Sequence, residues 1–215
     1  MRYCKDLPLA SQELPEPARS LFYYLYLILD MCSRKIVAWE VHETEAGDLA
    51  AKLIHQVCLA EGISVRPLVL HSDNGSPMKG ATLLETLYCL DVTPSYSRPR
   101  VGNDNAFAES LFRTCKYRPD YPVNGSKSSE DARAGVLSFT RWYNTEHKHS
   151  GLQLTTTPQC HGDEVEVISE HRKQVYEAAK ARRPDRWSCE IRNWALPDQL
   201  WLNPEHDMQE LNKAA

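Results

Sequence analysis

The sequence predicts an α/β protein in which helices flank one mixed sheet. The main observation is the order of patterns along residues 22–147, where strand-like and helix-like stretches follow one another as β-β-α-β-α-β-α-α. The second observation is composition, because 42% of the 215 residues are hydrophobic, which is enough for one main core with an appendage. We therefore expect a folded domain and not a disordered chain.

The predicted sheet begins with an antiparallel hairpin. Residues 22–30 and 35–42 are rich in aromatic and β-branched side chains, and the segment 32–34 between them is typical of a turn. Residues 1–20 precede this hairpin without sustained alternation, and prolines interrupt them at positions 8, 15 and 17. We expect that segment to be irregular, with a damaged first strand.

Helices and strands then alternate. Residues 46–61 carry apolar side chains at helical spacing, and Gly62 follows them as a stop signal. The apolar run 67–70 leads into an acid at position 73 and indicates a buried strand. Residues 79–90 are a predicted helix, and 91–96 are a predicted short strand.

The second half of the chain is mainly helical. Residues 97–105 form a predicted loop that contains Pro99 and Gly102. Helices are predicted at 103–116, at 129–147 and near 169–181, and a tryptophan-rich tail follows. We divide the chain into the irregular segment 1–20, a core at 21–160, and a helical, tryptophan-rich C-terminal extension at 161–215.

Composition also indicates which partners the protein can have and in which compartment it works. The longest apolar run, residues 21–29, is far shorter than the roughly 20 residues that a membrane helix needs, so we expect no membrane partner. Seven cysteines without a Cys-x-x-Cys pair indicate reduced thiols and a cytoplasmic protein. The net charge is −4, but cations gather near residues 98–118 and 180–192, so we expect one basic face. Ordinary solvated charges are the alternative.

Two carboxylates are the leading candidates for a site. Asp73 follows the apolar run at 67–70, and Glu109 opens the amphipathic stretch 109–116, with thirty-five residues between the two acids. An acid at a strand tip and an acid on a helix can converge, and convergent carboxylates are the oxygen ligands that Mg²⁺ needs for phosphoryl transfer. Because 29 acids give many pairs at any spacing, only the surrounding motifs distinguish a site from two unrelated surface acids.

Those motifs resemble the transposases of bacterial insertion sequences, in the DDE superfamily that includes retroviral integrases. The resemblance covers most of the chain, and its specificity lies in the order and spacing of motifs that are each weak alone. The motifs are Leu25-Tyr26-Leu27-Ile28-Leu29-Asp30, Ser33-Arg34-Lys35-Ile36-Val37, His71-Ser72-Asp73-Asn74-Gly75, Ser97-Arg98-Pro99-Arg100, Glu109-Ser110-Leu111-Phe112, Lys116-Tyr117-Arg118-Pro119-Asp120-Tyr121, Trp142-Tyr143-Asn144 and His147-Lys148-His149-Ser150-Gly151.

The resemblance implies a ribonuclease H-like fold and an integrase-type catalytic core that cleaves DNA strands and transfers them to a target. It implies three acids and two Mg²⁺ (or Mn²⁺) ions, with Asp73 and Glu109 as catalytic metal ligands. It also implies DNA partners (transposon ends and target), a homo-oligomer in the active form, and a bacterial, nucleoid-associated location. In the two-reading-frame branch of the family, a separate upstream helix-turn-helix protein would recognise the DNA ends, and we find no such region ahead of the core.

The family's first acid is the main departure from the pattern. An alignment without gaps places that acid at position 10, which is Ala10 in this chain. Asp6 is the alternative, but a shift of four residues moves the carboxylate by about 13 Å at ~3.3 Å per residue, so a longer loop would have to restore it. We therefore expect a truncated or impaired copy.

Four residues are predicted to contact DNA. The resemblance assigns Lys116 to the DNA end, and its spacing from Glu109 places both on one helix face. Asn74, Arg98 and Arg100 suit the phosphate backbone, where contacts depend on salt and not on sequence. A solvated lysine is the alternative for Lys116.

Three functions stay open at this point. The first is a transposase core, active or impaired, and the second is an inactive DNA-binding or inhibitory remnant. The third is a ribonuclease H-like nuclease with another substrate, against which the transposase-type stretch 142–151 argues.

Overall fold

The computed structural model describes residues 2–4, 23–60, 68–99, 101–122, 125–161 and 164–195. The chain divides into two compact units. The sheet unit contains the N-terminal residues to Met31 and Ile36–Thr140, and the C-terminal unit contains Cys32–Lys35 and Arg141–Leu200. The domain boundaries predicted at residues 20 and 160 stay predictions.

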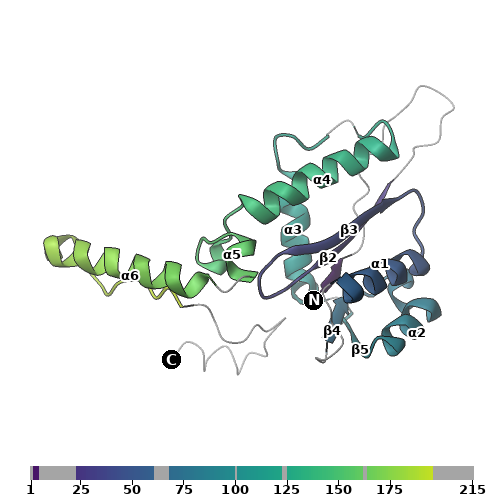
Figure 1. Cartoon of the computed structure of the whole chain (residues 1–215), viewed down its shortest axis with the longest axis horizontal. Helices are drawn as coiled ribbons and strands as arrows, with labels where there is room; N and C mark the ends of the chain where they lie inside the picture. Colours follow the sequence, from purple (N-terminus) through teal and green to yellow (C-terminus); the bar gives the residue numbers. More distant parts are fainter. Residues whose placement is uncertain are drawn as a thin grey trace. The chain divides into compact units, whose positions relative to one another are not determined.

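The sheet unit is built on five strands in the order β3-β2-β1-β4-β5 (Figure 1). The antiparallel part joins β1 (Arg2–Cys4), β2 (Tyr24–Leu29) and β3 (Ile36–His42). The parallel part joins β1 to β4 (Leu68–Ser72) and β4 to β5 (Val92–Tyr96). This mixed sheet confirms the predicted fold class, and the predicted hairpin is the β2–β3 pair.

The central strand differs from the prediction of an irregular N-terminal segment. Cys4 pairs with Leu27 of β2, and Arg2 pairs with His71 of β4, so three N-terminal residues fill the middle of the sheet. The reason is backbone pairing. The N–H and C=O groups of β2 and β4 that point toward β1 need hydrogen-bond partners, and any residues in an extended conformation can supply them. A strand of three residues is too short to show alternation. Asp6 and Ala10 lie outside the described residues.

Helices cover the sheet. The helix α1 (Gly47–Ala60) packs on β2 and β3 and against α2 (Ala81–Cys89), and a short 3₁₀ helix, η1 (Ser76–Lys79), precedes α2. The predicted helix 79–90 therefore begins after Gly80. Buried side chains of these elements form one core cluster, which includes Tyr26, Ile28, Leu53, Ile54, Val57, Leu70, Leu83 and Leu87.

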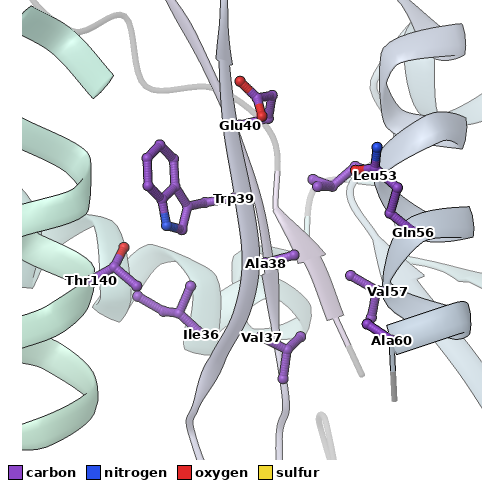
Figure 2. Close-up of a pocket in the computed structure, with 10 residues that line it drawn as sticks. All are labelled: Ile36, Val37, Ala38, Trp39, Glu40, Leu53, Gln56, Val57, Ala60 and Thr140. Atoms are coloured by element: carbon purple, nitrogen blue, oxygen red, sulfur yellow. The ribbon is translucent and has the colours of Figure 1, made fainter. Parts of the chain in front are cut away.

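The edge strand β3 lies between two helices. Figure 2 shows Thr140 of α4 (Ser129–Thr145) on one side of the strand and Val57 of α1 on the other, around a groove of about 340 Å³ lined also by Trp39. On the same edge, the Arg133 guanidinium of α4 donates to the Val41 carbonyl at 2.9 Å and pairs with the Glu40 carboxylate at 2.7 Å. Neither Asp73 nor Glu109 lines this groove.

The C-terminal unit is a helical extension, as predicted. Its main helix is α6 (Val165–Arg182), preceded by α5 (Thr157–His161) and followed by a 3₁₀ turn, η4 (Pro184–Arg186). Two guanidinium groups contact the ring of the buried Trp194, with Arg172 at 5.2 Å and Arg192 at 4.9 Å from the ring centroid. Among the described residues, no helix is both long and apolar enough to cross a membrane.

Candidate functional site

Asp73 is the first residue after β4. The strand ends in three buried residues, Leu70, His71 and Ser72, and Asp73 after them is partly exposed. One carboxylate oxygen, Oδ1, accepts the Gly75 N–H at 2.8 Å, which is an Asx turn that fixes the side chain. The other oxygen, Oδ2, has no hydrogen-bond partner among the described residues.

Glu109 lies in the first turn of α3 (Ala106–Lys116). The opposite face of this helix is buried through Ala108, Leu111 and Cys115, so Glu109 is left exposed. A carboxylate near a helix N-terminus is favoured by the helix dipole. In the part of the chain that the structure describes, the Glu109 carboxylate has no ion pair or hydrogen bond, so both of its oxygens can accept a ligand.

The loop that carries Asp73 is held by Ser97, directly after β5. The Ser97 N–H donates to the Ser72 carbonyl at 3.0 Å, and the Ser97 carbonyl accepts the Asn74 side-chain amide. Asp73 therefore lies between two residues that are both tied to Ser97. The Asn74 amide nitrogen, which was predicted to bind phosphate, is engaged in this intramolecular contact.

The segment that leads to Glu109 is held by Arg98. Its backbone N–H donates to Asp104 Oδ2 at 2.8 Å, and its Nε and Nη2 atoms donate to Oδ2 and Oδ1, both at 3.0 Å. Asp104 is 5% exposed and belongs to the 3₁₀ turn η2 (Gly102–Asn105), which runs directly into α3. Two N–H groups of the Arg98 side chain are thus directed at a buried carboxylate.

The remaining DNA-contact residues are placed only in part. Lys116 is exposed in the last turn of α3, the helix that carries Glu109. Arg100 lies outside the described residues. The DNA-binding roles of Lys116, Asn74, Arg98 and Arg100 stay predictions. The sequence did not single out Ser97 or Asp104 as site residues. The available signals were a polar residue directly after a predicted strand and an acid at the start of the helix predicted at 103–116, which in the structure begins only at Ala106.

The candidate metal ligands are of the right chemical type for a divalent ion, but there are only two of them among the described residues. Asp73 and Glu109 offer carboxylate oxygens, the ligands that Mg²⁺ and Mn²⁺ prefer. Among the described residues, no group of three or more His, Cys, Asp or Glu side chains could hold a metal ion. The described central strand, Arg2–Cys4, contributes no acid. Cys115 lies on the buried face of α3, where burial raises the pKa of its thiol to about 11.

Comparisons with known proteins agree with this fold. The integrase core domain family matches residues 11–101 and residues 90–158. A simian T-cell lymphotropic virus intasome, solved in complex with the PP2A regulatory subunit B56 gamma, contains a chain that matches with a TM-score of 0.51 at 14% identity, covering 74% of this chain and 53% of the other. This likeness concerns the fold alone. The chain therefore has the ribonuclease H-like fold of the integrase-core class.

Two curated relatives of this chain are transposases of bacterial insertion sequences. The transposase for insertion sequence element IS904 of Lactococcus lactis is 29% identical over 137 residues, covering 63% of this chain and 53% of the relative. A transposase ascribed to IS986/IS6110 of Mycobacterium tuberculosis is 27% identical over 130 residues, covering 57% and 46%. The chain belongs to the integrase core domain family, and it is similar to these insertion-sequence transposases. It spans about half the length of these relatives.

Proposed function

We propose that this chain is a transposase catalytic core that performs divalent-metal-dependent cleavage and transfer of DNA strands. The observation that carries the proposal is that two carboxylates have oxygens available for a ligand while their backbone segments are held in place. Asp73 keeps one oxygen and Glu109 keeps both without a partner among the described residues, and the two acid-bearing segments are anchored at consecutive residues, Ser97 and Arg98. Carboxylates held in place but not paired are what a metal site requires.

Each candidate site residue has a proposed role in binding metal or DNA. Asp73 and Glu109 hold the Mg²⁺ or Mn²⁺ ions, and bound metal supplies charge neutralisation at the scissile phosphate. Lys116, on the helix of Glu109, contacts the DNA end as a point charge. Asn74 and Arg98 lie in or next to the segments that carry the two acids, and with Arg100 they are proposed to position the phosphate backbone, with Arg98 acting while it remains paired to Asp104.

We further propose that catalysis is impaired in this chain. The gapless alignment puts Ala10 at the place of the first acid, and the described central strand Arg2–Cys4 is also without an acid. Each carboxylate removed subtracts one negative charge from a site for two dications, which weakens metal binding. Asp6 is the alternative third ligand. An inactive, DNA-binding or inhibitory remnant is the second candidate function, and the same missing acid favours it.

The partners follow from the reaction. The DNA partners are the transposon ends and the target, and bringing two ends together calls for at least two copies of the chain. Recognition of the ends by a separate upstream helix-turn-helix protein is proposed from the resemblance alone.

Mn²⁺ titration followed by electron paramagnetic resonance (EPR) of the free ion tests the site. Glu109→Gln should weaken Mn²⁺ binding, whereas Glu85→Gln, an exposed acid of α2 in the same unit, should leave it unchanged. Ala10→Asp should strengthen binding if the first acid has been lost, and Asp6→Asn should weaken it if Asp6 serves instead. Equal affinities for Glu109→Gln and Glu85→Gln would remove Glu109 from the site. Efficient joining of DNA ends by the unmodified chain would refute impairment.

A further inference from the structure

The residues directly after β5 contact both segments that carry the predicted metal ligands. Ser97 contacts the loop of Asp73, and Arg98 contacts the turn that begins the helix of Glu109. We propose that Ser97 and Arg98 are positioning residues that set the separation of the two carboxylates. This inference rests on the proposed function, in which Asp73 and Glu109 are metal ligands.

Ser97 acts through three of its groups. Its N–H and carbonyl hold Ser72 and Asn74, the residues on either side of Asp73. Its hydroxyl lies 3.2 Å from Nε2 of the buried His71, whose Nδ1 lies 3.0 Å from the Ser95 hydroxyl. With the His71 proton on Nε2, the ring donates to Ser97 and accepts from Ser95, so a single tautomer satisfies both contacts.

This arrangement makes the Asp73 backbone rigid. His71 and Ser95 are a registered pair of β4 and β5, and their side chains are in contact. The Ser97 N–H, bonded to the Ser72 carbonyl, continues the ladder past its last registered pair, Ser72 with Tyr96, and the Ser97 hydroxyl adds a contact to His71. Asp73 leaves the sheet where this extended pairing ends. Its carboxylate is then oriented by the Gly75 N–H.

Arg98 acts on the other acid. The Asp104 carboxylate is buried and receives three N–H donors from this one residue, with both oxygens engaged. The Arg98 side chain itself is 55% exposed. Because a buried carboxylate that loses its partners is strongly unfavourable, Asp104 holds the turn 98–104 closed, and that turn sets where α3 begins. Glu109 lies no more than about one and a half helical turns beyond the segment 98–104, so the start of α3 sets the position of Glu109.

The two anchors are consecutive residues. Their Cα atoms are therefore about 3.8 Å apart across a trans peptide, which is a rigid unit. Only the ψ angle of Ser97 and the φ angle of Arg98 are soft between these two Cα atoms, so we expect a displacement at one residue to be felt at the other and to couple the Asp73 loop to the start of α3. If each residue only stabilised its own surroundings, replacing Ser97 would affect only the Asp73 loop, and replacing Arg98 would affect only the start of α3.

The test compares Ser97→Ala, Arg98→Met and Arg98→Lys with two matched controls in the full chain. Arg133→Met removes another half-exposed arginine that makes an ion pair and a backbone contact in the sheet unit, and Ser126→Ala removes another buried serine hydroxyl. Amide hydrogen exchange by mass spectrometry follows the segments 72–79 and 102–112. Mn²⁺ affinity is measured by EPR of the free ion.

We expect Arg98→Met and Ser97→Ala each to speed exchange in both segments by at least about tenfold, which corresponds to a loosening of about 1.4 kcal/mol. Arg98→Lys should fall between wild type and Arg98→Met, and the controls should leave both segments unchanged. Wherever the parent chain binds Mn²⁺, the positioning variants should bind it at least about tenfold more weakly than controls of equal melting temperature.

Two results would overturn the inference. One is faster exchange confined to the segment that each residue touches, and the other is control variants that lose as much protection or Mn²⁺ affinity as Arg98→Met. A parent chain that binds no Mn²⁺ would count against the proposed function instead, and the exchange measurement would still decide whether Ser97 and Arg98 couple the two segments.

Discussion

Replacement of Leu111 by alanine should destabilise the sheet unit through the helix that carries Glu109. Leu111 is 2% exposed on the buried face of α3. The change removes three carbons, and at about 0.8 kcal/mol for each buried methylene the transfer loss alone is about 2.4 kcal/mol. A residual cavity raises the cost, so we expect about 3 kcal/mol.

The control is the same substitution on an exposed helix surface. Leu59 of α1 is 68% exposed, and Leu59→Ala should change stability by less than about 0.5 kcal/mol, since alanine also favours helix. Urea unfolding followed by far-ultraviolet circular dichroism measures both. With a slope of about 3 kcal/mol per M, the midpoint of Leu111→Ala should fall by about 1 M. Equal midpoints for the two variants would refute the packing of α3 through this face.

Three further predictions follow from other parts of the chain. Burial, then the neighbouring His147 and Arg34 charges, lower the pKa of His149 from 6.5 to about 4, so the unfolded chain binds a proton in this interval that the folded chain does not. Stability should therefore fall as pH falls from 6.5 to 4, and His149→Gln should flatten that dependence in acid-unfolding curves. Burial raises the pKa of Cys115 to about 11, so alkylation at pH 8 with mass-spectrometric mapping should label the exposed Cys189 and leave Cys115 unlabelled until urea is added. Arg133→Met should cost only about 1 kcal/mol, because its ion pair is half-exposed, and the loss should shrink in high salt.

Much of the sheet unit follows from local pattern. The aromatic and β-branched stretches became β2 and β3, and the helical spacing after them became α1. The strand that ends at Asp73 and the helix that carries Glu109 also lie where the sequence predicts them. The reason is that burial against a sheet imposes a period of two on strands and 3.6 on helices, and a short window of sequence displays both.

The contacts that hold the two acids could not be predicted in this way. Nothing in the local pattern around Arg98 distinguishes a guanidinium for phosphate from one directed at Asp104, and Ser97 reads as an ordinary loop residue. These side chains find their partners only after β4 and β5 pair, since His71 and Ser97 are twenty-six residues apart.

The central strand is a second feature that local sequence does not predict. By itself, the sequence determined the kind of sheet and the integrase-core family, because both depend on residue type and spacing along the chain, whereas the role of the two carboxylates stays a prediction. Only the tertiary structure decided that Arg2–Cys4 complete the sheet and that Ser97 and Arg98 hold the acid-bearing segments. Both depend on hydrogen-bond partners that are distant in sequence and become neighbours through folding.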